Sequence, residues 1–404
     1  MTGVKVFPGG FDTVDRSPPL TWWLVVHIVD ITMFYPAESG GVRTYLSAKS
    51  NWLSQRRGIE HTVIAPGAGS RTARDGHGLI AVPGIRIPGR MGVRIPLSTA
   101  RAERVLTTLR PDLIEVGDPY QFAWTALRVK RALGVPAIAF YHTDLPRVVQ
   151  QRFGGAASFA AIAYLRRLYR DFDLVLAPSR AAVQRLHSIG IEQVRHQALG
   201  VDTGIFHPMR RSSTLREELG LPDNTRLLVY AGRFTREKKL PLLVDAVEHL
   251  GPPYHLLMIG GSMGKRRSSS VTCLPFQTNR ELARLLASCD ALVHPGDGET
   301  FGLIVLEAMA SGIPVVGVRS GGVAELIDDS CGVLADPNHT GSLAQGIRRL
   351  YARDMAAMGH AARARVSRLY DWQVIMPQFL RQYARVLNAA GGGLIEREAS
   401  DGWI

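Results

Sequence analysis

Short apolar, β-branched runs alternate with amphipathic stretches along most of this chain. In the first half, the apolar runs lie at residues 24–29, 61–65, 113–116, 137–141 and 173–177. A helical pattern at residues 42–56 follows the first run, and further helical patterns separate most of the others. Strands that are apolar throughout are typical of a parallel sheet covered by helices on both faces. The order therefore predicts an α/β fold.

The alternation stops at residues 200–208, where Gly and Pro, together with the basic pair Arg210 and Arg211 just beyond, indicate a linker. It then restarts, with strand-like runs at residues 226–232, 255–259, 291–294 and 314–318. A length of 404 residues suits two domains of about 150–200 residues each. We predict two doubly wound domains that face each other across a cleft, with ligands at the carboxyl ends of the strands.

Composition excludes several classes of protein. A hydrophobic content of 46% with 21% charged residues is typical of a globular enzyme. The cysteines Cys273, Cys289 and Cys331 have no metal-site or disulfide-framework spacing. No apolar run approaches the roughly 20 residues that span a bilayer, and the run from Trp22 favours a buried strand over a signal peptide. We expect a cytoplasmic protein. The net charge of +13 indicates a nucleic acid, an anionic membrane or a phosphorylated ligand as partner.

The second half carries a strand–loop–helix junction suited to a diphosphate. A helix predicted from Gly302 would offer free backbone N–H groups and a positive dipole end to phosphates. Glu307 lies about one turn further along, roughly 5–6 Å past Leu303, where it could accept hydrogen bonds from ribose hydroxyls. Glu299 precedes the helix and would face the sugar. Arg233 and Lys238, which follow another strand, could converge on a phosphate or belong to a solvated basic loop.

The string Glu299-Thr300-Phe301-Gly302-Leu303, continued through Glu307-Ala-Met-Ala, resembles the E-x(7)-E signature of retaining glycosyltransferase family 4. The resemblance runs from about residue 24 to 387. It implies the GT-B fold, in which two Rossmann-like domains face across a cleft and the last helix crosses back to the first domain. We accordingly expect an acceptor-binding domain over residues 1–205, with an extension at 1–20. A nucleotide-sugar-binding domain would cover 206–370, and a returning helix and tail would cover 371–404.

The same resemblance assigns further donor-side residues. Arg233 and Lys238 match the spacing of the family's diphosphate clamp, although Lys239 stands where Gly is usual. Gly40 and Gly41 resemble the Gly-Gly loop that faces the donor phosphates, and His142 falls where a family histidine lies near the donor sugar. Phe276 lies where related enzymes contact the base. The chain departs from the family at residues 260–267, where a basic loop replaces a G-x-G-P turn. Glu299, His142, Arg233 and Lys238 are the expected catalytic residues.

The sequence gives less specific signals for the acceptor-binding residues than for the donor-binding residues. Asp118 and Asp144 follow strands and could orient the acceptor hydroxyl, but each could equally cap a helix or shape a turn. Asp171 and Asp173 form a D-x-D that immediately precedes a strand, which favours a structural role over a metal site. No cluster has metal-ligand spacing, so we expect no metal and no cofactor, with the diphosphate neutralised by Arg233, Lys238 and the helix dipole.

Residues 145–170 contain five arginines and no acidic residue, interleaved with apolar side chains. Such a segment could dock on anionic headgroups at the inner membrane surface or be an ordinary solvated face over a core helix. Arg90, Arg94, Arg101 and Arg104 could extend it.

These features predict a retaining glycosyltransferase that moves a hexose from a UDP- or GDP-linked sugar to an alcohol acceptor. The acceptor would belong to glycolipid or polysaccharide biosynthesis, with mannose and glucose as the leading sugars. A phosphorylase or a sugar-nucleotide epimerase is the alternative. A nucleic-acid partner is not expected, because the arginines are not interleaved with a stacking platform.

Overall fold

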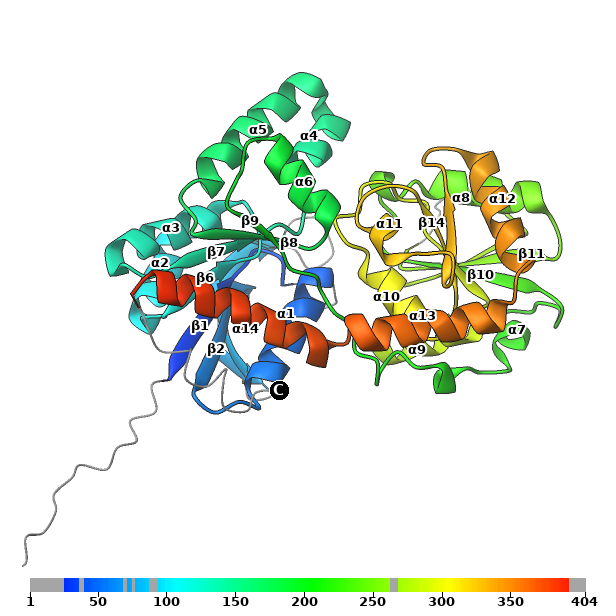
Figure 1. The fold of residues 1–404 in the computed structure, drawn as a ribbon, viewed down its shortest axis with the longest axis horizontal. Coiled ribbons are helices and arrows are strands. Elements are labelled where there is room, and N and C mark those ends of the chain that lie inside the picture. Colours follow the sequence, from blue (N-terminus) through cyan, green and yellow to red (C-terminus); the bar gives the residue numbers. More distant parts are fainter. Residues whose placement is uncertain are drawn as a thin grey trace, which may run out of the picture.

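The computed structural model describes residues 25–35, 40–67, 71–74, 77–86, 94–261 and 268–391, which form two sheets (Figure 1). The first sheet has the order β3-β4-β2-β1-β6-β7-β8-β9, and β5 pairs with β4. Its strands are β1 (Val26–Ile31), β2 (Ile59–Gly67), β3 (Arg71–Arg74), β4 (His77–Arg86), β5 (Arg94–Pro96), β6 (Leu113–Val116), β7 (Ala137–Phe140), β8 (Leu174–Ala177) and β9 (Val194–His196). Only the pairs that β4 makes with β3 and β5 are antiparallel in this described sheet.

Helices cover both faces of the first sheet because its strands alternate their side chains between two apolar layers. Ile28 of β1 packs in one layer with α1 and α14, whereas Val29 packs in the other with α2, α3, α5 and α6. The helices are α1 (Gly41–Leu53), α2 (Thr99–Leu109), α3 (Gln121–Leu133), α4 (Leu145–Phe153), α5 (Gly155–Tyr169), α6 (Arg180–Ser188) and α14 (Trp372–Ala389).

The second sheet is parallel throughout its described strands, in the order β12-β11-β10-β13-β14-β15. This is the doubly wound order 3-2-1-4-5-6, which places a crevice at the carboxyl ends of the strands where the order reverses. Its elements are β10 (Arg226–Ala231), α8 (Leu240–Leu250), β11 (Tyr254–Ile259), β12 (Val271–Leu274), α9 (Asn279–Ser288), β13 (Ala291–Val293), α10 (Leu303–Ala310), β14 (Val315–Val318), α11 (Val323–Leu326), β15 (Gly332–Ala335), α12 (Thr340–Tyr351) and α13 (Met355–Leu369).

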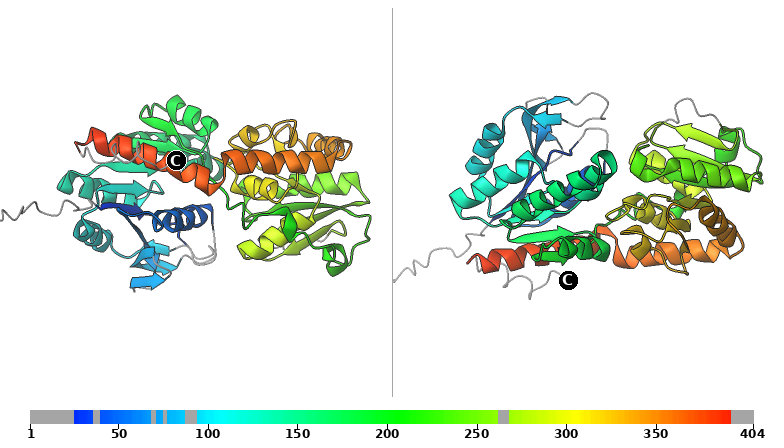
Figure 2. Two further views of the ribbon diagram at one scale, coloured as in Figure 1. Left: turned by 60° about the horizontal axis from the view of Figure 1, so that its bottom comes forward. Right: turned by 90° about the horizontal axis from the view of Figure 1, so that it is seen from above.

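The last two helices run along both lobes (Figure 2). α13 packs on α10 of the second lobe, and α14 continues onto α1 of the first. Trp52 of α1 donates a hydrogen bond to Gln373 at 2.9 Å. The backbones of Val201 and Trp372 are also joined, so the chain leaving the first lobe and the chain returning to it lie side by side. The returning helix implied by the family resemblance is therefore present.

A buried group of charges fastens α14 to the first sheet. Lys49, whose side chain is fully buried, contacts Asp30 at 2.7 Å and Glu115 at 3.2 Å. Glu115 also accepts hydrogen bonds from Tyr45 of α1 and Tyr383 of α14, each at 2.6 Å. Burial raises the pKa of Glu115 to about 7, although Lys49 opposes the shift.

The predicted α/β class is confirmed, and the structure shifts several predicted boundaries. The first strand begins at Val26 instead of residue 24, and α1 ends at Leu53 instead of residue 56. Strands β3, β4, β5, β9, β12 and β15 were not predicted. The division at residues 205 and 206 stays a prediction, and the two sheets lie on either side of it. The extension 1–20, Arg90 and the basic residues 265–267 lie outside the described residues.

No helix in the described part of the chain has the length and apolarity needed to cross a membrane.

We predict that Lys49→Met lowers the free energy of unfolding by about 3–5 kcal/mol, because it removes the buried ammonium that Asp30 and Glu115 share and leaves Asp30 with only its His61 contact. Urea unfolding measures the loss. Lys130→Met is the matched control: Lys130 pairs with Asp173 at 2.7 Å, but these side chains are 23% and 38% exposed, so its loss should stay below about 1 kcal/mol. Equal losses in the two variants would contradict this view of the buried charges.

Candidate active site

The site begins at the turn before α10. Gly302 has a φ of 109°, in the left-handed region that favours glycine, and forms the N-cap of the helix. Behind the turn, a Cβ added at Gly322 would lie 2.5 Å from the carbonyl oxygen of Thr300, so a side chain there would push the turn away. The first amide groups of α10 thus open at the carboxyl edge of the second sheet, as an anion site requires.

Glu307 lies on α10 without a recorded partner for its carboxylate among the described residues. Burial raises the pKa of Glu307 to about 7, and no cation in the described part of the chain offsets the shift. A carboxyl group in this state gains from any ligand that donates hydrogen bonds to it. Its position one helical turn beyond Leu303 is the one expected for a ribose contact.

Glu299 lies in a different environment. Its carboxylate forms an ion pair with Lys238, which ends the short 3-10 helix η2 (Arg236–Lys238), and lies 3.4 Å from Nε2 of His294. Burial and the charge of Arg233 lower the pKa of the Lys238 ammonium to about 8. Burial likewise lowers the pKa of His294 to about 3, so this imidazole is neutral at physiological pH. Thus Lys238 and Glu299, predicted separately, are in contact.

His142 faces this loop from the first lobe. Its ring stacks on Phe140 with centroids 4.2 Å apart and lies 5.6 Å from the ring of Tyr45. Burial lowers the pKa of His142 to about 3, and its Nε2 has no hydrogen-bond partner among the described residues. Oγ1 of Thr300 donates to the His142 carbonyl at 2.9 Å. The loop of Glu299 is therefore attached to the strand end that carries the histidine.

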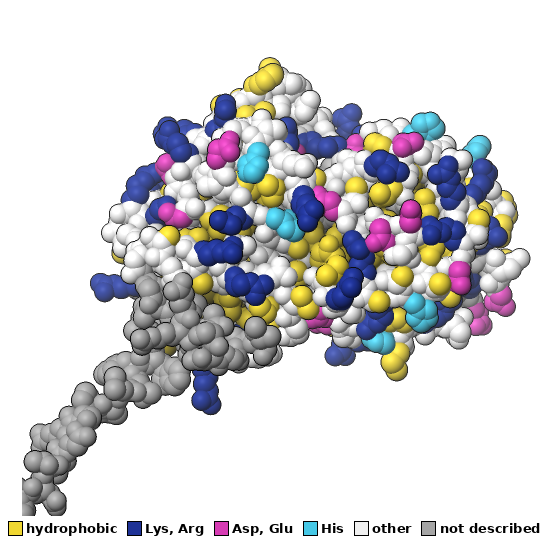
Figure 3. Space-filling model, in the orientation of Figure 1, with side chains coloured by type: hydrophobic (Ala, Val, Ile, Leu, Met, Phe, Trp, Pro, Cys, Tyr) yellow, Lys and Arg dark blue, Asp and Glu magenta, His cyan; other side chains and the backbone are white. Residues whose placement is uncertain are grey.

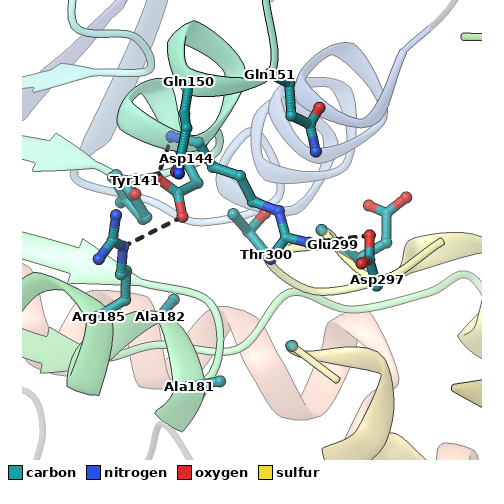
Figure 4. Close-up of a pocket in the computed structure, with 13 residues that line it drawn as sticks. Tyr141, Asp144, Gln150, Gln151, Ala181, Ala182, Arg185, Asp297, Glu299 and Thr300 are labelled. Carbon is teal, nitrogen blue, oxygen red and sulfur yellow. Dashed lines mark hydrogen bonds and ion pairs between the residues drawn. The ribbon is translucent and has the colours of Figure 1, made fainter. Parts of the chain in front are cut away.

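A cavity of about 580 Å³ opens between the two lobes beside Glu299 (Figure 4). Tyr141, Asp144 and residues of α4 and α6 line it from the first lobe, and residues 297–300 with Gly321 line it from the second. Two arginines hold ion pairs at its edge: Arg147 with Asp297 at 2.9 Å and Arg185 with Asp144 at 3.4 Å.

The remaining donor-side candidates lie around the same edge. Gly40 and Gly41 begin α1, and a Cβ added at Gly41 would lie 3.1 Å from Leu303, so the Gly-Gly loop faces the start of α10. Phe301 is buried against Tyr370.

The other donor-side candidates lie in exposed loops. Arg233 is exposed in the loop after β10, and Phe276, 42% exposed, follows β12. Lys239, where the family usually has Gly, has a φ of 54°, so it occupies the left-handed region that favours glycine.

The candidate aspartates have structural contacts. Asp118 is buried and accepts hydrogen bonds from Thr32 at 2.9 Å and the Met33 amide at 2.6 Å, which shapes the turn after β1. Asp144 caps α4 through the Arg147 amide and also lines the cavity. Asp173 accepts from the Ala137 amide and pairs with Lys130, a structural role as expected.

Sequence reasoning missed four residues of the site: His294, Arg147, Arg185 and Asp297. His294 ends a predicted strand at the same sheet edge as Lys238, which is a usable signal. Arg185 and Asp297 meet the cavity only through the packing of the two lobes, and no spacing in the sequence reveals this. Among the described residues, no group of three or more His, Cys, Asp or Glu side chains is placed to hold a metal ion.

This fold and site define a class of enzyme, the GT-B glycosyltransferases. Residues 39–204 match the family model described as Glycosyltransferase Family 4, and residues 212–365 match Glycosyl transferases group 1. The chain belongs to glycosyltransferase family 4.

Its relatives include a GDP-mannose-dependent alpha-mannosyltransferase of Mycobacterium tuberculosis, 34% identical over 68% of this chain and 74% of the relative. A GDP-mannose-dependent alpha-(1-6)-phosphatidylinositol dimannoside mannosyltransferase of the same species is 32% identical over 86% of this chain and 93% of the relative. Sucrose-phosphate synthase from Thermosynechococcus elongatus is similar in fold, with a TM-score of 0.76 at 21% identity over 90% of this chain and 100% of that structure.

We predict that Glu307→Gln raises the melting temperature of the nucleotide-free protein at pH 8.5. The pKa of Glu307 lies above its unfolded value, so its contribution to stability is full below about pH 4.5 and is lost as the pH rises through about 7. The gain should be about 1–3 kcal/mol at pH 8.5 and about 4-fold smaller at pH 5. Thermal melts at both values test this, and an equal gain at both would contradict it.

Proposed function

We propose that this chain transfers mannose from GDP-mannose to a hydroxyl group of a phosphate-bearing, lipid-linked acceptor, with retention at the anomeric carbon. The proposal depends mainly on the different environments of the two glutamates. Glu299 is paired with Lys238 at the cavity, whereas the carboxylate of Glu307 on α10 has no partner among the described residues. The choice of GDP-mannose follows the two mycobacterial relatives.

The donor would bind along α10. The diphosphate would meet the amide groups at Gly302 together with Arg233 and Lys238, and the carboxylate of Glu307 would accept hydrogen bonds from the ribose. Fixed charges aimed at the departing diphosphate supply the kind of electrostatic stabilisation that dominates many enzymes. With two cations and a helix end at the phosphates, we expect transfer to continue in EDTA.

The sugar would lie between Glu299 and His142. In the ligand-free protein Glu299 contacts Lys238 and His294, so a bound donor would compete with these contacts for the carboxylate. The neutral ring of His142 has Nε2 free of recorded partners and can bond one sugar hydroxyl. Among the described residues, the other two carboxylates at the cavity, Asp144 and Asp297, are each paired with an arginine, which disfavours a double displacement. Attack on the same face as the departing phosphate, which would take the acceptor proton, fits this arrangement.

The cavity beside Glu299 would receive the acceptor. Arg147 and Arg185 line it, and their partners Asp297 and Asp144 are carboxylates of the protein itself. An acceptor phosphate could replace either partner, because guanidinium groups bind phosphate and carboxylate by the same two-pronged geometry. This supports an acceptor in which a phosphate lies near the reacting hydroxyl.

A membrane surface would supply that acceptor through α4 and α5, which pack as a hairpin at the top of the molecule, where Figure 3 shows apolar side chains beside basic ones. Val148, Phe153 and Phe159 are 46%, 68% and 75% exposed. Arg152 lies over the Phe153 ring at 5.6 Å. Because Arg147 on the same hairpin lines the cavity, we propose that the hairpin docks on anionic lipid at the cytoplasmic face of the membrane.

We predict that GDP raises the melting temperature of the wild-type protein more than UDP or ADP does. Glu307→Ala should remove most of that shift, because the ribose would lose both of its hydrogen bonds, worth about 1.5–3 kcal/mol each when the acceptor is charged. Thermal-shift titration measures both effects. A larger shift with UDP would reject the donor, and an unchanged shift in Glu307→Ala would reject the site.

Glu299→Ala is expected to lower turnover with GDP-mannose by at least about 100-fold, because an interaction made with the sugar in the transition state is lost. Its GDP affinity should change by less than about 3-fold, since Glu299 would face the sugar and not the nucleoside in the proposed arrangement. Transfer of labelled mannose to membrane lipid gives the rate. Release of sugar phosphate, or an isomerised donor, would instead indicate a phosphorylase or an epimerase.

The double variant Phe153→Ser, Phe159→Ser is expected to bind vesicles containing anionic lipid at least about 5-fold more weakly, because each phenyl ring removes apolar area from water. Vesicle flotation compares it with the wild type and with Met209→Ser, which alters an 88% exposed apolar side chain outside the hairpin. Equal recovery of wild type on neutral and anionic vesicles would reject docking.

A further inference from the structure

The start of α6 is capped by a side chain from the opposite lobe. The two carboxylate oxygens of Glu325, on α11 of the second lobe, accept hydrogen bonds from the amide groups of Arg180 and Ala181 at 2.9 and 2.6 Å. Helix starts leave such amide groups without helical partners, and a carboxylate there also gains from the helix dipole.

Ser179 adds a second link at the same place. Its hydroxyl accepts from the Ala182 amide at 3.1 Å as the N-cap of α6, and it donates to the carbonyl of Thr300 at 2.7 Å. Ser179 is 2% exposed, so its hydroxyl is shielded from competing water. We call the contacts that Ser179 and Glu325 make with the opposite lobe the clasp.

The clasp acts on the loop that carries Glu299. Thr300 follows Glu299 directly, and the Gly322 amide donates to the Glu299 carbonyl at 3.0 Å. Gly321 and Gly322 leave no room for a Cβ against the Glu299 and Thr300 carbonyls, which such atoms would approach to 2.5 Å. Glu325 lies three residues further along this segment. A displacement of α11 or of Thr300 should therefore move Glu299 as well.

We propose that Ser179 and Glu325 are positioning residues that close the two lobes and hold the Glu299 loop against His142. The closing contacts themselves are independent of the proposed function. Only the statement that the closed site transfers a sugar rests on it. Most of the proposed nucleotide contacts, Glu307 and the start of α10 among them, belong to the second lobe, whereas the Gly40-Gly41 loop belongs to the first, so we expect nucleotide binding to depend little on the clasp. Transfer does need it, because His142 and Glu299 come from opposite lobes.

The double variant Ser179→Ala, Glu325→Ala tests this proposal in the full-length protein. Loss of a hydrogen bond to a charged group corresponds to a change of about 10-fold or more in an equilibrium constant. The equilibrium between closed and open lobes should therefore shift toward the open form. We expect kcat to fall at least about 10-fold and the radius of gyration from small-angle X-ray scattering to increase. The dissociation constant of GDP should stay within about 2-fold of wild type.

Conservative variants separate positioning from simple loss of stability. Ser179→Thr keeps the hydroxyl and should restore most of kcat, whereas Glu325→Gln keeps one acceptor and should give an intermediate rate. Asp329→Asn and Ser188→Ala, exposed residues near Glu325 and at the far end of α6, should behave as wild type in all three measurements.

The proposal is overturned if the double variant keeps wild-type kcat and radius of gyration, or if it loses GDP binding in parallel with kcat. These outcomes are distinguishable from failure of the proposed function, which the effect of Glu307→Ala on GDP binding and the product of the reaction test independently of Ser179 and Glu325.

Discussion

The buried ammonium of Lys49 holds together parts of the chain that are far apart in sequence. It forms ion pairs with Asp30 on β1 and Glu115 on β6, and Glu115 in turn accepts a hydrogen bond from Tyr383 of α14. Because α14 continues from α13, which packs on α10, this anchor places the second lobe relative to the first. The carboxyl ends of both sheets then face one cavity. A site shared by two domains needs such an anchor, since an interface between domains otherwise permits relative motion.

Within that frame, one short motif provides two carboxylates with opposite properties. Glu299 is surrounded by Lys238 and His294, and its charged form already has partners. Glu307 is half-buried with no described cation beside it, and this partial burial raises its pKa to about 7. The charged carboxylate of Glu299 suits contact with a sugar that bears positive charge in the transition state. The carboxylate of Glu307 suits hydrogen bonds from hydroxyl groups, which only a bound nucleoside would bring. A pair of groups whose environments differ in this way is typical of functional sites.

Much of this organisation is predictable from the sequence, and the missing parts share physical causes. Strands β6 and β10 and the start of helix α10 were predicted to within a residue, because apolar runs and glycine signals define them locally. Strands β3, β4 and β5 carry mixed polar and apolar residues at one end of the first sheet, so no continuous apolar run marks them in the sequence. Contacts between lobes, such as Arg147 with Asp297 or Glu325 with α6, depend on tertiary packing that periodicity cannot express. The family resemblance supplied His142 and the Gly-Gly loop, which residue patterns alone left open.

The most direct test of this account is a crystal structure of the protein with GDP bound. The account predicts the ribose within hydrogen-bond distance of the Glu307 carboxylate and the diphosphate at the amide groups of Gly302 and Leu303. Arg233 and Lys238 should contact the phosphates, with Glu299 facing the space beyond them. A nucleotide bound in another orientation, with its ribose away from Glu307 or its phosphates away from α10, would contradict the division of roles between the two glutamates.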